Sequence, residues 1–119
     1  MIGKIIAITF LSRDLAHREH LRTTSYAQHM ALGDFYEDVI EAADSLAELY
    51  QGRKGIIKEI PLLDDEPKAD IADTLQEHMD MIEEVRYKAV DKADTPIQNQ
   101  IDTVVGIYLT ALYKLRNLK

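Results

Sequence analysis

The sequence contains no cysteine, which excludes both a disulfide framework and a thiolate metal site. A metal ion would need histidine, aspartate or glutamate as its ligands. Also missing are a Gly-rich loop for phosphate, the HExxH motif of zinc proteases and the nucleophile elbow of hydrolases. Histidines and carboxylates are therefore the first candidates for chemistry in this chain.

Basic residues are few compared with acidic ones. The chain has 14 Lys and Arg against 21 Asp and Glu, a net charge of −7, which repels the phosphate backbone of nucleic acid. Direct nucleic-acid binding is therefore not expected. The apolar opening Ile5–Leu11 is far too short to cross a bilayer. We expect a cytoplasmic protein, and 119 residues suit a single four-helix domain.

Apolar residues recur at helical spacing in four segments, and no segment alternates as a strand does. The first segment runs from about Ile2 to Leu21, although its β-branched start would also suit a strand. The second is expected to begin after a Ser25 cap and to end at Gly52. These two segments predict a helical hairpin with a short turn.

The third helix is expected to open near Pro67, because proline suits a first helical position. It carries His78 in the middle of an apolar stripe, where we expect a core or interface histidine rather than a ligand. After a turn at residues 91–94, Thr95 is expected to cap the fourth helix, with Pro96 as its first residue. A second short hairpin follows from this spacing.

The connection Gly52–Glu66 differs from the two short turns. It is long enough to return along the whole second helix. It carries an apolar patch consisting of Ile56, Ile57, Ile60, Leu62 and Leu63. The predicted fold is therefore an all-α four-helix bundle with two antiparallel hairpins joined by one long crossover, the arrangement of ferritin-like bundles; the same loop could also decorate an up-and-down bundle.

The first hairpin holds the candidate metal ligands His17, His20, His29, Asp44 and Glu48. Imidazole and carboxylate together suit iron, manganese or zinc. His29 and Asp44 are fifteen residues apart, about 22 Å along a helix, so one chain cannot bring both to one ion. Two copies packed antiparallel about a two-fold axis could, and would form two equivalent sites. The metal hypothesis therefore requires a homo-oligomer.

The spacing His17-x11-His29-x14-Asp44-x3-Glu48 resembles the ferroxidase motif of the mini-ferritins called DNA-protection-during-starvation (Dps) proteins. The segment from His20 to Glu37 also resembles a small ferritin-like family encoded in bacteriophage genomes, in which His20 rather than His17 is paired with His29. The resemblance covers roughly residues 14–52. It implies Fe²⁺ binding between two subunits, and oxidation of the iron by peroxide or oxygen in an oligomeric shell.

Several positions depart from the mini-ferritin pattern. The tryptophan that follows the first histidine there is Arg18 or Leu21 here, and the acidic ligand four residues after the second is Gly33. Loss of this carboxylate would weaken a two-iron site and leave one metal, with Asp34 or Glu37 as the nearest substitutes. The basic tail that some members use for DNA is also absent.

Two other functions suit the same sequence. Asp44 and Glu48 could simply belong to a solvated acidic helix face, with the histidines as ordinary structural or surface residues. The protein would then be a non-enzymatic helical interaction protein, such as a phage accessory or inhibitor protein, which contacts its partner through the apolar crossover segment Ile56–Leu63. A third possibility keeps the fold with a purely structural metal at the interface.

Overall fold

The first two helices form an antiparallel hairpin that is half of the bundle. In the computed structural model, which describes residues 1–119, α1 spans Ile2–Arg22 and α2 spans Tyr26–Lys54. The Oγ of Ser25 accepts a hydrogen bond from the backbone N–H of Gln28 and so caps α2 as expected. The β-branched start of α1 is helical because Ile5, Ile6 and Ile8 are buried against the other helices.

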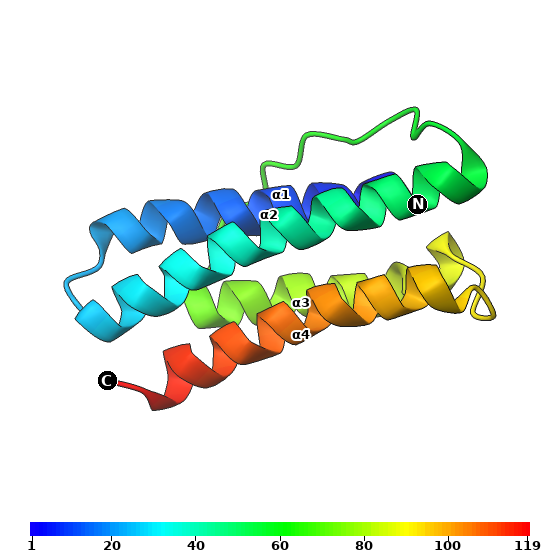
Figure 1. The fold of residues 1–119 in the computed structure, drawn as a ribbon. Coiled ribbons are helices and arrows are strands. Elements are labelled where there is room, and N and C mark those ends of the chain that lie inside the picture. The colour runs from blue at the N-terminus through cyan, green and yellow to red at the C-terminus, as the bar shows by residue number, and fades with distance from the viewer.

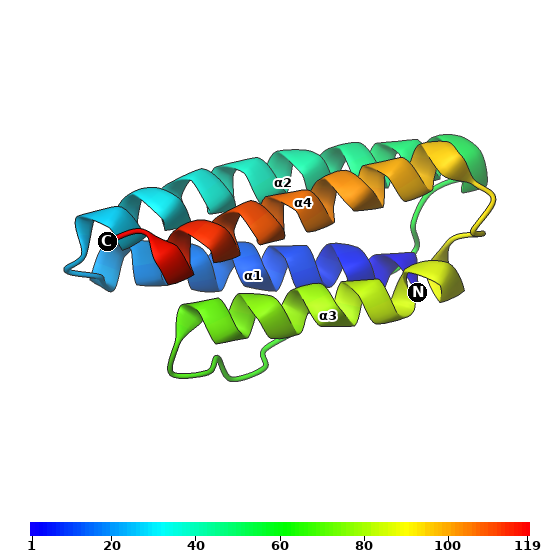
Figure 2. The same ribbon diagram turned by 90° about the horizontal axis from the view of Figure 1, so that it is seen from below.

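The second hairpin consists of α3, Ile71–Ala89, and α4, Thr95–Asn117. Figures 1 and 2 show α1 beside α2 and α3, and α4 beside α2 and α3, with neighbouring helices antiparallel. The segment between α2 and α3 returns along the bundle before α3 begins (Figure 1). The chain is thus an all-α four-helix bundle with one long crossover, as predicted.

Three predicted helix boundaries differ from the structure. The second helix continues through Gly52 and ends at Gly55, whose φ of 89° is easy only for glycine. The third helix begins at Ile71, not near Pro67, because the Asp70 side chain accepts a hydrogen bond from the Ala72 N–H. In the fourth, Asp94 is the cap residue and Thr95 the first helical residue.

The crossover packs closely on the start of α1. A Cβ added to Gly3 would lie only 2.0 Å from the Glu59 carbonyl oxygen, so no larger residue fits without moving the crossover. Ile57 and Leu63 pack against the core, whereas Ile56 and Leu62 are almost fully exposed. The apolar patch of the crossover is therefore divided between the core and the surface. None of the helices is both long enough and apolar enough to span a membrane.

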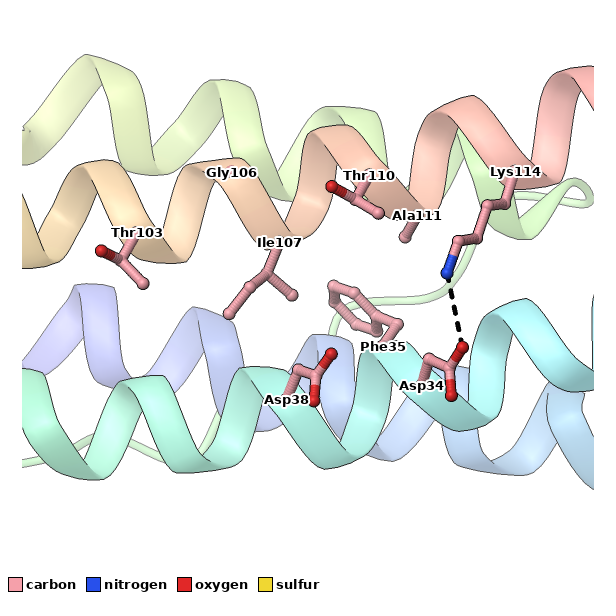
Figure 3. A pocket seen from close by; sticks show the side chains of 9 residues that line it. All are labelled: Asp34, Phe35, Asp38, Thr103, Gly106, Ile107, Thr110, Ala111 and Lys114. Atoms are coloured by element: carbon pink, nitrogen blue, oxygen red, sulfur yellow. Dashed lines mark hydrogen bonds and ion pairs between the residues drawn. The ribbon is translucent and has the colours of Figure 1, made fainter.

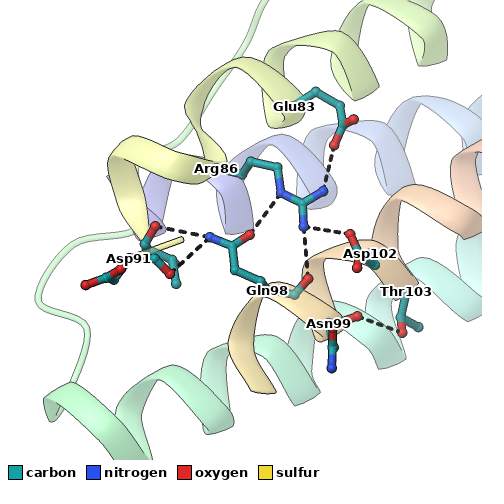
Figure 4. Close-up of polar contacts among 8 residues, drawn as sticks. Glu83, Arg86, Asp91, Gln98, Asn99, Asp102 and Thr103 are labelled. Atoms are coloured by element: carbon teal, nitrogen blue, oxygen red, sulfur yellow. Dashed lines mark hydrogen bonds and ion pairs between the residues drawn. The ribbon is translucent and has the colours of Figure 1, made fainter. Parts of the chain in front are cut away.

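A buried arginine joins α3 to α4 (Figure 4). Arg86 donates to the side-chain and backbone oxygens of Gln98, both at 3.0 Å, and forms ion pairs with Asp102 at 2.7 Å and Glu83 at 2.9 Å. The Gln98 amide in turn donates to the Val90 carbonyl. All polar atoms of this buried contact therefore have partners, which fixes how α4 leaves the short turn.

Candidate metal-binding site

His20 and His29 form a reciprocal pair beside the α1–α2 turn. The Nδ1 of His20 lies 2.7 Å from the carbonyl oxygen of His29, and the Nδ1 of His29 lies 2.9 Å from the carbonyl oxygen of His20. Since a carbonyl oxygen can only accept, each Nδ1 must carry a proton. In a neutral ring Nε2 then keeps its lone pair, which is the state in which histidine binds a metal ion.

The two rings are stacked, with centroids 3.7 Å apart and planes inclined by 18°. Gly33 makes room for them one turn further along α2. A Cβ at position 33 would lie 3.2 Å from Cε1 of His20 and 3.4 Å from its Nδ1. Gly33 therefore accommodates the His20 ring.

His17 belongs to the same cluster but does not contact His29. Its ring stacks on Tyr36 with centroids 4.1 Å apart, and its centroid lies 6.1 Å from that of His20. The ring of Tyr36 also meets His20 edge-on at 5.3 Å. The structure therefore pairs His20 with His29, and it holds His17 against a tyrosine.

The two carboxylates of the candidate site lie away from the imidazoles. Asp44 and Glu48 are exposed on α2 and form no ion pair. Fifteen residues of α2, about 22 Å, separate Asp44 from His29. Within one chain no three His, Asp or Glu side chains gather where they could hold a metal ion. The five predicted ligands are thus brought together only in part.

The nearest acidic substitutes do not complete the imidazole pair within the chain. Asp34 forms an ion pair with Lys114 at 3.4 Å, on the α4 side of α2 (Figure 3). It lines a groove between these helices together with eight other residues: Phe35, Asp38, Thr103, Gly106, Ile107, Thr110, Ala111 and Lys114. Glu37 is exposed and has no such partner. Asp34 is therefore engaged with α4, whereas His29 contacts α1.

Comparison with known families adds one finding to this geometry. Residues 20–115 match a family of unknown function (DUF5856). The chain belongs to this family. The match to DUF5856 begins at His20 and includes His29, Asp44 and Glu48, but not His17. Neither the curated proteins nor the solved structures include a match to the chain.

A second group of reactive side chains lies in the core of this DUF5856 member. Ser12 Oγ is 2.6 Å from Nδ1 of His78, and the Tyr108 hydroxyl donates to the same Oγ at 2.7 Å. Ser12 and Tyr108 are fully buried, and His78 is 6% exposed, which confirms the prediction of a buried histidine. The sequence did not indicate this group, because its members are 66 and 96 residues apart and Ser12 follows no motif.

Burial shifts the acid–base behaviour of this group. It lowers the pKa of His78, although the nearby carboxylates of Glu77 and Asp65 act in the opposite direction. It also raises the pKa of Tyr108 far above its usual range, although the Ser12 hydrogen bond acts in the opposite direction. At neutral pH both side chains are therefore neutral. Ser12 is fully buried between them.

Proposed function

We propose that the protein binds iron at a site shared between two copies, with His20 and His29 from one copy and Asp44 and Glu48 from the other. The observation that carries this proposal is the pair of Nδ1–H to carbonyl hydrogen bonds, which leaves both Nε2 lone pairs free. Metal-binding histidines commonly have their second nitrogen fixed in this way. Manganese and zinc suit the same donors.

The positions of Asp44 and Glu48 support their role as the ligands from the second copy. Asp44 and Glu48 are one helical turn apart on α2, and both are exposed and free of ion pairs. An antiparallel copy of α2 would place them beside the imidazole pair of its partner, and the symmetry would create two such sites. His17 would lie at the edge of the site and stay stacked on Tyr36.

The chemistry of the proposed site follows from its donors. Neutral imidazoles would hold Fe²⁺ as a substrate, and the carboxylates would balance the charge that increases when the iron is oxidised. The iron would give up one electron to oxygen or peroxide, which agrees with the resemblance to mini-ferritins. The protein would then be a ferroxidase or iron-storage protein.

Anaerobic titration with Fe²⁺, followed by exposure to peroxide, tests the proposal. The wild type is expected to develop ferric absorbance, and His29→Ala and His20→Ala should develop much less. His17→Ala is the matched control and should retain most of the signal, because its ring stacks on Tyr36 instead of His29. Equal absorbance from all four proteins, or none from the wild type, would remove the ferroxidase function.

The crossover supports one alternative function. Ile56 is 78% exposed and Leu62 completely exposed, next to residues that pack against the core. Large apolar side chains that are exposed together on one segment suit contact with another protein. A stable complex that forms without metal and is lost in Leu62→Ser would favour this function over iron binding.

A further inference from the structure

The hydrogen bonds among Ser12, His78 and Tyr108 join three of the four helices. Ser12 comes from α1, His78 from α3 and Tyr108 from α4, and Tyr108 also packs edge-on against Phe35 of α2 with ring centroids 5.0 Å apart. Across the α1–α3 contact, Ser12 and His78 form the only hydrogen bond between side chains. A change in this hydrogen bond therefore changes how strongly α3 is held against α1.

Only one orientation of the hydroxyl hydrogens satisfies the whole chain. Tyr108 donates to Ser12, so the Ser12 hydrogen must go to an acceptor, and Nδ1 of His78 is the atom in reach at 2.6 Å. Nδ1 then has no proton, and Nε2 has one. No buried side-chain atom is left without a partner in this arrangement.

Protonation of His78 breaks this arrangement. Nδ1 becomes a donor and can no longer accept from Ser12, so one hydroxyl hydrogen of Ser12 or Tyr108 loses its acceptor inside the core. The new charge is also buried, although two carboxylates attract it: Glu77 on α3 itself and Asp65 on the crossover. Ser12 from α1 and Tyr108 from α4 contribute no charge. Protonation of His78 therefore weakens the hydrogen bond between α3 and α1. The positive charge is then attracted by carboxylates on α3 and on the crossover.

We propose that Ser12, His78 and Tyr108 form a pH-sensitive latch, which holds α3 to α1 and α4 when His78 is neutral and releases α3 when His78 is protonated. The end of the crossover next to α3 would move with that helix, because it is tied to the start of α3. Its Lys68 N–H donates to Thr74 Oγ1 at 2.8 Å, and the Lys68 side chain pairs with Glu77 at 3.1 Å. This device does not depend on metal binding.

Amide hydrogen exchange of the metal-free protein, measured by NMR at pH 7.5 and pH 5, tests the latch. After correction for intrinsic rates, amides of α3 should exchange at least about tenfold faster at pH 5, since one buried hydrogen-bonding group is left unpaired. Amides of α2 should change much less. ¹⁵N shifts of the His78 ring should show Nδ1 unprotonated at pH 7.5, with a titration midpoint equal to that of α3 exchange.

His78→Gln supplies the matched variant, because glutamine can accept from Ser12 but does not titrate. Its α3 exchange should be the same at both pH values, whereas His17→Gln should keep the wild-type response. Unchanged α3 exchange in the wild type, an equal response in His78→Gln, or different midpoints for the ring and for α3 would overturn the proposal. The midpoint comparison needs only the wild type, so it decides the question even if His78→Gln fails to fold.

Discussion

At the scale of single residues, the imidazole pair depends on what surrounds its rings. The Nδ1 of each histidine is tied to the backbone of the other helix, and Gly33 leaves the space that the His20 ring fills. A Cβ at position 33 would lie 3.2 Å from this ring, so the ring would have to shift. The stacking of the two histidines therefore depends on the small residue at position 33.

Gly33→Ala tests whether position 33 constrains the His20 ring, and Gly52→Ala in the same helix is the control. Nothing lies within 4 Å of a Cβ at position 52, so that change should raise the free energy of unfolding by roughly 0.5–1 kcal/mol. Gly33→Ala should fall short of this gain by about 1 kcal/mol or more, because the His20 ring must move. Denaturant unfolding measures both variants, and equal gains would show that the ring is not constrained by Gly33.

His78 makes stability depend on pH. Because burial lowers its pKa below the ordinary value of 6.5, the unfolded chain binds the proton at a higher pH than the folded one. The contribution of neutral His78 is complete above pH 6.5 and is lost as the pH falls through the folded-state pKa. The free energy of unfolding of the wild type should therefore fall more steeply below pH 6.5 than that of His78→Gln; parallel curves would contradict this.

At the scale of elements, the crossover is fixed at its contact with α1. The Gly3 position lies against the Glu59 carbonyl, a backbone atom that cannot move without the crossover. Where the crossover leaves this contact, Ile56 and Leu62 face solvent. The crossover therefore packs against α1 at Glu59 and exposes an apolar side chain on each side of this contact.

Gly3→Ala should detach this part of the crossover. We expect a loss of about 1–3 kcal/mol in the free energy of unfolding, the usual effect of overpacking, and faster tryptic cleavage after the exposed Lys58. Gly106→Ala is the control, since its Cβ would meet nothing within 4 Å. Wild-type cleavage rates in Gly3→Ala would mean that the crossover is not held at this point.

The helices could be predicted because their apolar spacing is local, whereas their ends depend on competition between nearby signals. Pro67 suited a helix start, but the Asp70 cap is better placed, and Gly52 was tolerated because Gly55 provides the positive φ that ends α2. The contact between Ser12 and His78 had no local signal at all. The stacking of His20 on His29 likewise depends on how the hairpin closes.

At the scale of the whole molecule, the bundle is a rod of 44 × 25 × 21 Å. Its long α2 carries His29 near one end, where His20 of α1 meets it, and unpaired carboxylates further along. A second copy lying head to tail would bring the imidazoles of one copy to the carboxylates of the other. The cations bound there would offset part of the net charge of −7. The proposed function and the proposed dimer therefore stand or fall together.

Mixing two defective variants tests this claim most directly. One variant carries His20→Ala and His29→Ala, and the other carries Asp44→Asn and Glu48→Gln; neither should bind Fe²⁺ alone. In a mixed dimer one of the two sites is intact, so random assembly should restore about a quarter of the wild-type metal content, measured by native mass spectrometry. Metal binding by either variant alone, or no recovery on mixing while the wild type binds, would contradict the shared site.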